Sequence, residues 1–214
     1  ASTYYAGTPA GGIWKSTDSG VNWIPLSDEL PQIGVSAIAI DPLDSNTLYI
    51  GTGEVYNYRE TGDRVAVRTT RGSYGMGILK TTDGGATWNK SLDWAYDELK
   101  GVQDLQVDEF DPSIVWAATS EGTYKTTDAG ANWSLLHTSL MASEVYLFPG
   151  QPDTVFVSAG NLNTPNGGIF RSYDGGANFT QLTNGLPGAF TGKILLDGTA
   201  PPAAFELYAS VADS

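Results

Sequence analysis

One nine-residue pattern occurs four times in this chain of 214 residues and constrains its fold more than any other feature. Each copy reads basic, Ser/Thr, any residue, Asp, any residue, Gly, any two residues, aromatic. The four aspartates are Asp18, Asp83, Asp128 and Asp174, which stand 65, 45 and 46 residues apart. A motif that returns at such intervals indicates a structural unit that is stacked in series.

The pattern itself predicts a strand, a tight turn and a second strand. Asp and Ser/Thr side chains hydrogen-bond to backbone amides across a turn, and Gly adopts positive φ without a Cβ clash. The aromatic residue then re-enters the sheet and packs on it. The turn residues predicted in this way are Ser16, Asp18, Gly20 and Trp23; Thr81, Asp83, Gly85 and Trp88; Thr126, Asp128, Gly130 and Trp133; and Ser172, Asp174, Gly176 and Phe179.

Two more strands precede most of these turns. Residues 2–8, 46–52, 113–119, 153–159 and 205–211 align as one strand, and residues 35–41, 102–108, 143–148 and 192–197 align as the strand before it. Each repeat therefore contains strands A, B, C and D, with the Asp motif between C and D. The 26 glycines and abundant aromatic residues agree with an all-β chain.

The repeat resembles the Asp-box (BNR) repeat of sialidases, sortilin-type receptors, some xyloglucanases and many large exported bacterial proteins. The resemblance implies an all-β fold, a β-propeller of four-stranded antiparallel blades with Asp boxes in the C–D turns. We expect a single propeller segment over residues 1–214, with blade 1 (strands B–D) at 1–30, blade 2 at 31–92, blade 3 at 93–138, blade 4 at 139–185 and the start of blade 5 at 186–214.

The strand order BCD, ABCD, ABCD, ABCD, AB predicts an arc of a larger propeller, whose remaining blades come from a longer chain. Closure into a four-bladed ring is the open alternative. The boxes are expected to stabilise turns only, because in the resembling families they lie on the face opposite the ligand. Each box offers one carboxylate where Ca²⁺ takes six to eight oxygens. With no cysteine and a single histidine, His137, we expect no metal site and no cofactor.

Ligands of the resembling families bind on the face that carries the B–C and D–A loops. One B–C loop interrupts the repeat and runs from Glu54 to Tyr74, and it contains four of the five arginines of the chain. An Arg/Tyr loop suits an acidic glycan, a carboxylate or an acidic protein patch. Ion pairing within the loop is the alternative. The candidate residues are Glu54, Tyr56, Tyr58, Arg59, Arg64, Arg68, Arg71 and Tyr74.

The segment 89–98 is expected to be the neighbouring D–A loop. Trp94 and Tyr96 are candidates to stack on a sugar face, and Asp93 is a candidate to bond its hydroxyls. Trp94 could equally fill the hydrophobic gap between blades.

Composition excludes other classes of partner. A net charge of −13 argues against nucleic-acid or anionic-membrane binding, and no apolar run is long enough for membrane insertion. Absence of cysteine fits a bacterial exported protein. We therefore expect a secreted or cell-surface location and, as partner, a glycan or protein on the loop face.

Three functions are compatible with these features. The preferred one is a non-catalytic recognition, adhesion or scaffold module. The alternative is a glycoside hydrolase of the xyloglucanase-like or sialidase-like propeller type, and the third is a purely structural segment. An arginine triad from separate blades is not visible, and no pair of catalytic carboxylates can be assigned. These absences favour a protein that is not an enzyme.

Overall fold

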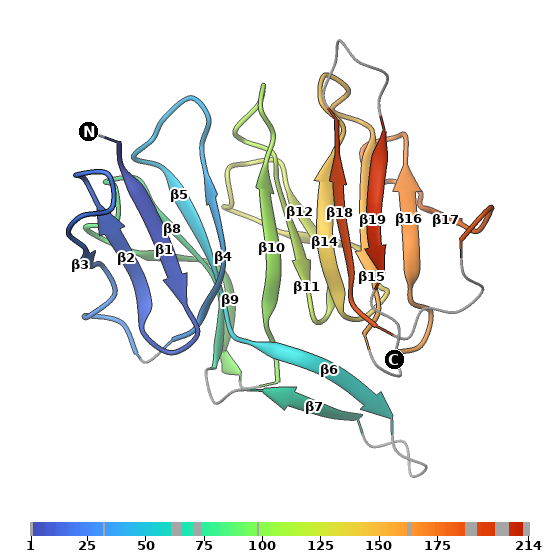
Figure 1. Ribbon diagram of the computed structural model, residues 1–214, viewed down its shortest axis with the longest axis horizontal. Coiled ribbons are helices and arrows are strands. Elements are labelled where there is room, and N and C mark those ends of the chain that lie inside the picture. Colours follow the sequence, from blue (N-terminus) through green and yellow to red (C-terminus); the bar gives the residue numbers. More distant parts are fainter. Residues whose placement is uncertain are drawn as a thin grey trace.

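The structure is a computed structural model that describes residues 2–31, 33–60, 66–70, 74–97, 99–161, 164–186, 192–199 and 206–211. For residues 57–60 and 66–70 it describes the backbone. Within these ranges the regular secondary structure consists of β-strands alone (Figure 1). The prediction of an all-β fold is confirmed.

The described strands form three four-stranded antiparallel sheets, in which consecutive strands pair along the chain apart from one inserted hairpin. We call these sheets blades 2, 3 and 4. They consist of β4 (Val35–Ile40), β5 (Leu48–Thr52), β8 (Gly75–Thr81) and β9 (Asn89–Asp97); β10 (Val102–Val107), β11 (Val115–Thr119), β12 (Gly122–Thr126) and β13 (Ser134–His137); and β14 (Ala142–Leu147), β15 (Val155–Ala159), β16 (Gly168–Ser172) and β17 (Thr180–Leu182).

Three smaller sheets complete the described structure. Blade 1 has three strands, the terminal hairpin has two, and a two-stranded arm is inserted in blade 2. Their strands are β1 (Tyr4–Thr8), β2 (Gly12–Ser16) and β3 (Ile24–Pro25) in blade 1; β18 (Ile194–Gly198) and β19 (Leu207–Val211) in the terminal hairpin; and β6 (Val55–Glu60) and β7 (Ala66–Thr70) in the arm.

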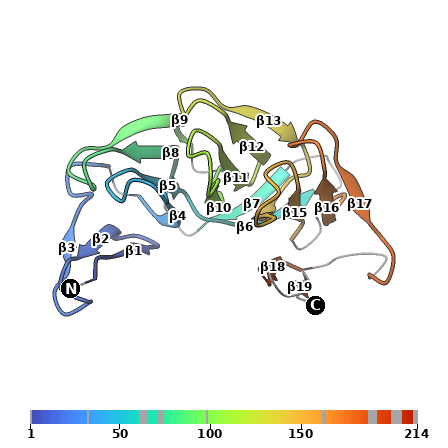
Figure 2. The same cartoon turned by 90° about the horizontal axis from the view of Figure 1, so that it is seen from above.

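The blades stand side by side as an arc, with blade 1 at one end and the terminal hairpin at the other (Figure 2). In blades 2, 3 and 4 the first strand lies on the inner side of the arc, and the fourth lies on the outer side. This is the arrangement of propeller blades, and an arc of a larger propeller fits it.

One expected boundary is wrong. Strand β9 runs through the expected division between residues 92 and 93, because Gly75 pairs with Asp97 and Gly77 pairs with Asp93. The segment 89–98, expected to be a D–A loop, is therefore mainly strand. Positive φ angles at Ala95 (53°) and Tyr96 (66°) accompany the irregular register there.

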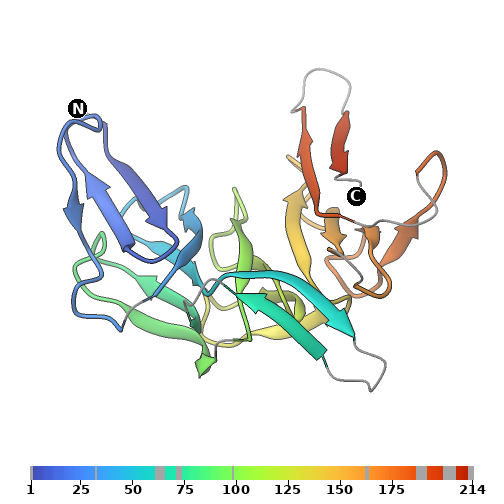
Figure 3. The ribbon, with the colours of Figure 1, turned by 60° about the horizontal axis from the view of Figure 1, so that its bottom comes forward.

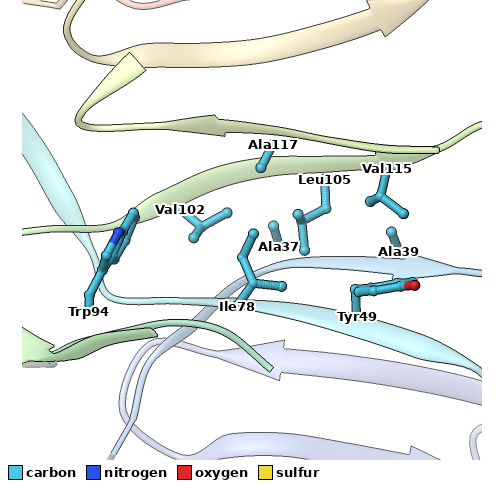
Figure 4. Close-up of a cluster of buried hydrophobic side chains, with 9 residues drawn as sticks. All are labelled: Ala37, Ala39, Tyr49, Ile78, Trp94, Val102, Leu105, Val115 and Ala117. Atoms are coloured by element: carbon cyan, nitrogen blue, oxygen red, sulfur yellow. The ribbon is translucent and has the colours of Figure 1, made fainter. Parts of the chain in front are cut away.

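The hydrophobic core consists of layers between neighbouring blades. Between blades 2 and 3, Tyr49, Ile78, Val102 and Leu105 form one such layer with Trp94 (Figure 4). Equivalent layers occur between blades 1 and 2, between blades 3 and 4, and between blade 4 and the terminal hairpin. Because each layer needs both of its blades, the stability of one blade depends on its neighbours.

The repeated motif forms the same turn in all four positions, and we call the segments 15–23, 80–88, 125–133 and 171–179 the Asp turns. In the third, Thr126 Oγ1 donates to Asp128 Oδ1 at 2.7 Å and accepts the N–H of Gly130 at 3.0 Å. Asp128 Oδ1 also accepts the N–H of Asn132 at 2.8 Å. The other three turns repeat these bonds.

These hydrogen bonds favour the ionised carboxylate. Donation from the side chain and then the backbone of Asn132 lowers the pKa of Asp128 from 3.8 to about 2. The side chain of each turn aspartate is therefore occupied in holding the turn.

Candidate functional site

The arm crosses the face of the arc that carries the B–C loops. It leaves blade 2 after β5 and passes blade 3 toward blade 4 (Figures 1 and 3). Gln103 Nε2 of blade 3 donates to the carbonyl oxygen of Val55 at 2.8 Å, and Asn161 Nδ2 of blade 4 donates to the carbonyl oxygen of Tyr56. Side chains from two other blades therefore hold β6 in place.

Two glycines form the base of the arm. A Cβ on Gly53 would lie 2.6 Å from the Cα of Gly75 and 2.4 Å from the carbonyl oxygen of Lys100. Only glycine permits this approach, and Gly53 also has a φ of 83°. Glu54 and Tyr74 flank these glycines in sequence, so both start from the same base.

A cavity of about 280 Å³ lies beside this base and is lined by Gly7, Pro9, Val35, Ser36, Glu54, Val55, Tyr56 and Gln103. Within it, Tyr56 Oη donates a hydrogen bond of 2.6 Å to Glu54 Oε2. A carboxylate, a phenol and an amide thus share a small recess between blades 1, 2 and 3. These are groups that bind hydroxyl-rich ligands.

Two tyrosines stack where β8 begins and β9 ends. The rings of Tyr74 and Tyr96 have centroids 4.5 Å apart and an interplanar angle of 19°. Tyr96 is 37% exposed, although it belongs to a strand. The pair offers aromatic surface close to the arm base.

Asp93 is half-exposed and pairs with Lys90, with Nζ and Oδ1 separated by 2.9 Å. It also accepts the N–H of Ala95 at 2.8 Å. The bond from Lys90 is the main cause that lowers the pKa of Asp93. Asp93 is therefore held as a carboxylate, which accepts hydrogen bonds rather than donating a proton.

Trp94 is only 9% exposed and lies in the layer between blades 2 and 3 (Figure 4). Alternation along β9 places its side chain opposite to those of its neighbours. Trp94 therefore fills the hydrophobic gap between blades, and its ring is not placed to stack on a sugar.

The arginines of the predicted loop fall where the structure describes no side chain. The backbones of Tyr58 and Arg68 face each other as partners in the arm, and Arg59 is paired with Val67. The side chains of Tyr58, Arg59 and Arg68 lie outside the described structure, as do residues Arg64 and Arg71 entirely.

Two carboxyl groups were missed by the sequence reasoning. Asp104 of β10 accepts the N–H of Val145 at 3.1 Å, and Glu144 of β14 accepts the N–H of Leu196 at 2.5 Å. Burial raises the pKa of both groups. Each links the first strand of one blade to the next, which no short sequence pattern indicates.

Across the described ranges, no group of three His, Cys, Asp or Glu side chains is placed to hold a metal ion. His137 lies against Phe170 and Phe179, at 4.3 and 4.8 Å between ring centroids, and burial lowers its pKa. In the same part of the chain there is no helix long and apolar enough to cross a membrane.

No protein-family model matches the chain. A xyloglucanase of Acetivibrio thermocellus is 28% identical over 218 residues, covering 83% of this chain and 24% of that protein. A probable oligoxyloglucan-reducing end-specific xyloglucanase of Neosartorya fischeri is 26% identical over 194 residues, covering 69% of this chain and 22% of that protein. The chain thus spans a minor part of either relative.

A solved structure of a glycoside hydrolase is also similar to this chain. The crystal structure of a GH74 enzyme of Niastella koreensis matches with a TM-score of 0.60 and 25% identity, over 84% of this chain and 28% of that one. The chain is therefore similar to the propellers of glycoside hydrolases.

The preferred expectation of a non-catalytic recognition, adhesion or scaffold module is wrong. The proteins that this chain resembles over most of its length are named xyloglucanases. The comparison favours the alternative, a glycoside hydrolase, over the expectation of a protein that is not an enzyme.

Proposed function

We propose that this chain is part of the propeller of a glycoside hydrolase that acts on xyloglucan, and that it supplies glycan-binding surface. The observation that carries the proposal is the 28% identity to a xyloglucanase over 83% of the chain. The rest of such a propeller, supplied by a longer chain, would complete the catalytic centre.

The arm face supports this assignment chemically. Sugar rings bind through aromatic faces and through carboxylate, amide and hydroxyl groups. The stacked pair of Tyr74 and Tyr96, and the recess that holds Glu54 and Tyr56, present both kinds of group on one face of blade 2. We assign the glycan to this face.

Three further assignments belong to the same proposal. The Asp turns are of the Asp-box kind, since they share its residues and one hydrogen-bond pattern. The chain is one propeller segment with divisions between residues 30 and 31, 138 and 139, and 185 and 186. The division expected between residues 92 and 93 is moved beyond β9. The protein is bacterial and exported.

Binding to the polysaccharide is the direct test. We expect the chain to be retarded in native gels that contain xyloglucan, and Tyr96→Ala to weaken this retardation about tenfold in apparent affinity. Phe110→Ala is the matched control, because Phe110 is an aromatic residue 67% exposed on the opposite face. Equal retardation of both variants, or none for the unaltered chain, would contradict the assignment.

Catalysis is tested separately, by the release of reducing ends from xyloglucan by the longer protein that contains this arc. Tyr96→Ala should reduce that release, mainly through KM. Undetectable release, together with normal retardation of the chain, would leave the binding surface in place and remove the hydrolase from the proposal.

A further inference from the structure

A groove of about 540 Å³ lies at the outer edge of the joint between blades 1 and 2. One wall is formed by residues 25–30 of blade 1, and the other by residues 85–88 of the second Asp turn. Strand β3, where the first wall begins, is the outer strand of blade 1 (Figure 2). Both walls consist of described residues, so this chain forms the groove by itself.

The first wall exists because the outer strand of blade 1 is short. Strand β3 has two residues, whereas β9, the outer strand of blade 2, has nine. After Pro25 the chain turns, and the N–H of Leu30 donates to the carbonyl oxygen of Ser27 at 3.0 Å. The corresponding groove between blades 2 and 3 measures about 290 Å³. The groove between blades 1 and 2 is therefore more than a feature that every joint repeats.

The floor of the groove is apolar. Leu26, Leu30 and Trp88 pack against the core layer between blades 1 and 2, and each remains partly exposed. Trp88 Nε1 donates to the carbonyl oxygen of Leu26 at 3.0 Å, which fixes the orientation of the indole. The groove thus presents an aromatic and an aliphatic surface that a ligand can reach from outside.

The rim of the groove is negatively charged. Asp28 and Glu29 are exposed on the turn after β3, and neither carboxylate is bonded or ion-paired to another residue of the described structure. Among its described lining residues there is no lysine or arginine. The groove between blades 2 and 3 is lined instead by Lys80 and Lys90. Two uncompensated carboxylates therefore distinguish the groove between blades 1 and 2.

The hydrogen-bonding groups of the lining favour a cation over a sugar. The indole N–H of Trp88 is already bonded to Leu26, and Thr87 Oγ1 donates to Asp83 Oδ2 at 2.6 Å. The side chains that remain for a ligand are the two carboxylates, which accept hydrogen bonds when ionised. Sugar hydroxyls both donate and accept, whereas an ammonium or guanidinium group only donates. The lining is thus complementary to an organic cation with an apolar body.

We propose that this groove binds an arginine or lysine side chain from an exposed segment of a partner protein. The aliphatic stem packs on Leu26 and Leu30. The cationic head lies beside the indole of Trp88 and pairs with Asp28 or Glu29. Arginine suits the site best, because its planar guanidinium stacks on aromatic rings and pairs with carboxylates. Charge complementarity specifies this occupant, since the chain has a net charge of −13 and no cation of its own lines the described groove.

Binding of a basic peptide tests the proposal. The probe is a fluorescein-labelled hexapeptide that alternates arginine and leucine, and fluorescence anisotropy measures its Kd for the full chain. We expect saturable binding at about 50 mM salt that weakens at about 300 mM, because salt screens exposed charges. A hexapeptide that alternates glutamine and leucine should bind about tenfold more weakly or less tightly still.

Removing the rim charges should weaken binding of the arginine peptide. The double variant Asp28→Asn, Glu29→Gln should raise Kd about tenfold, since it removes both partners of the cation. The matched control is Glu109→Gln with Asp153→Asn, which removes two exposed carboxylates from blades 3 and 4 and gives the same net charge. This control should raise Kd less than about twofold.

Filling the groove should weaken binding without a change of charge. Ala86 lines the groove, and the first Asp turn has Val21 at the same position, so the turn accepts a larger side chain. Ala86→Leu should raise Kd about fivefold. Ala131→Leu, the same change in the third Asp turn, should leave Kd unchanged. An unchanged melting temperature verifies that each variant is folded.

Four results would overturn the proposal. The first is an equal rise of Kd in the two double variants, which would indicate general attraction to an acidic protein. The second is a folded Ala86→Leu variant that binds the peptide like the unaltered chain. The third is displacement of the peptide by xyloglucan oligosaccharides, which would assign the groove to a glycan. The fourth is self-association of the chain that Asp28→Asn, Glu29→Gln abolishes, which would assign the groove to a second copy.

The groove and the proposed glycan surface can fail independently. Tyr74 and Tyr96 do not line the groove. Loss of peptide binding with normal retardation by xyloglucan would therefore concern the groove alone, and loss of retardation with normal peptide binding would concern the glycan surface alone.

Discussion

Lys125 of blade 3 donates a hydrogen bond of 2.8 Å to the carbonyl oxygen of Gly175 in blade 4. The same ammonium group lies 4.8 Å from the ring centroid of Trp116, and burial lowers its pKa. Residues fifty positions apart are therefore joined by a charge-assisted bond, and the carbonyl oxygen is presented by a turn that the chain repeats four times.

Replacing this lysine should loosen the joint between two blades. Lys125→Met keeps the aliphatic stem on Trp116 and removes the donor, so we expect a loss of about 2 kcal/mol in the free energy of unfolding. Urea denaturation measures it. Lys90→Met is the control, because Lys90 forms an exposed ion pair with Asp93 worth about 0.5 kcal/mol. Equal losses for the two variants would show that the bond to Gly175 contributes little.

The hydroxyl of Thr126 organises the third Asp turn from a buried position. Thr126→Val leaves the N–H of Gly130 without its acceptor and should reduce the free energy of unfolding by about 1–3 kcal/mol. Thr127→Val, one residue further along and exposed, should change it by less than about 0.5 kcal/mol. A similar effect at both positions would contradict the role of Thr126.

The turn aspartates predict loss of stability in acid. The pKa of Asp18, Asp128 and Asp174 is about 2 in the fold against an ordinary value of 3.8. A lowered pKa contributes stability above the unfolded value, and this stability disappears as the pH falls toward the folded value. Urea midpoints should therefore drop between pH 4 and pH 2. A midpoint that stays constant over this window would rule out the ionised turns as a source of stability.

For Asp104 we expect the opposite dependence of stability on pH. Burial raises its pKa, so the folded chain binds a proton more readily than the unfolded chain. Stability is therefore lost as the pH rises from the unfolded pKa of Asp104 through its folded pKa. Asp104→Asn retains an oxygen to accept the N–H of Val145 and removes the charge. We expect the variant to be more stable than the unaltered chain at pH 7 and to lose this advantage at pH 3. A variant less stable at pH 7 would show that the ionised carboxylate is required.

Replacing Trp94 should mainly affect stability, whereas replacing Tyr96 should mainly affect glycan binding. Trp94→Ala removes a buried ring from the layer between blades 2 and 3 and should cost about 3–5 kcal/mol of unfolding free energy. Tyr96→Ala removes a ring that is 37% exposed and should cost about 1 kcal/mol or less while weakening retardation by xyloglucan. If the Trp94→Ala variant has the same free energy of unfolding as the unaltered chain, the assignment of Trp94 to the core is wrong.

The turns could be predicted well because their bonds are local. Ser16, Asp18 and Gly20 interact within four residues, and the same holds in the other turns. The site could not be predicted as well. Expected loop residues 89–97 form strand β9, since the pairing of Gly75 with Asp97 extends the sheet. The four clustered arginines, the strongest chemical signal of the loop, lie where no side chain is described.

The amino-acid sequence alone determined the all-β repeat, the order of strands and the position of each Asp turn. Spacing and turn chemistry act over a few residues, so they can be read along the chain. Tertiary structure alone decided that Trp94 is core, that the arm reaches Asn161, and that the carbonyl oxygen of Gly175 meets Lys125. These contacts join distant segments, and they arise only when neighbouring blades bury their faces against each other.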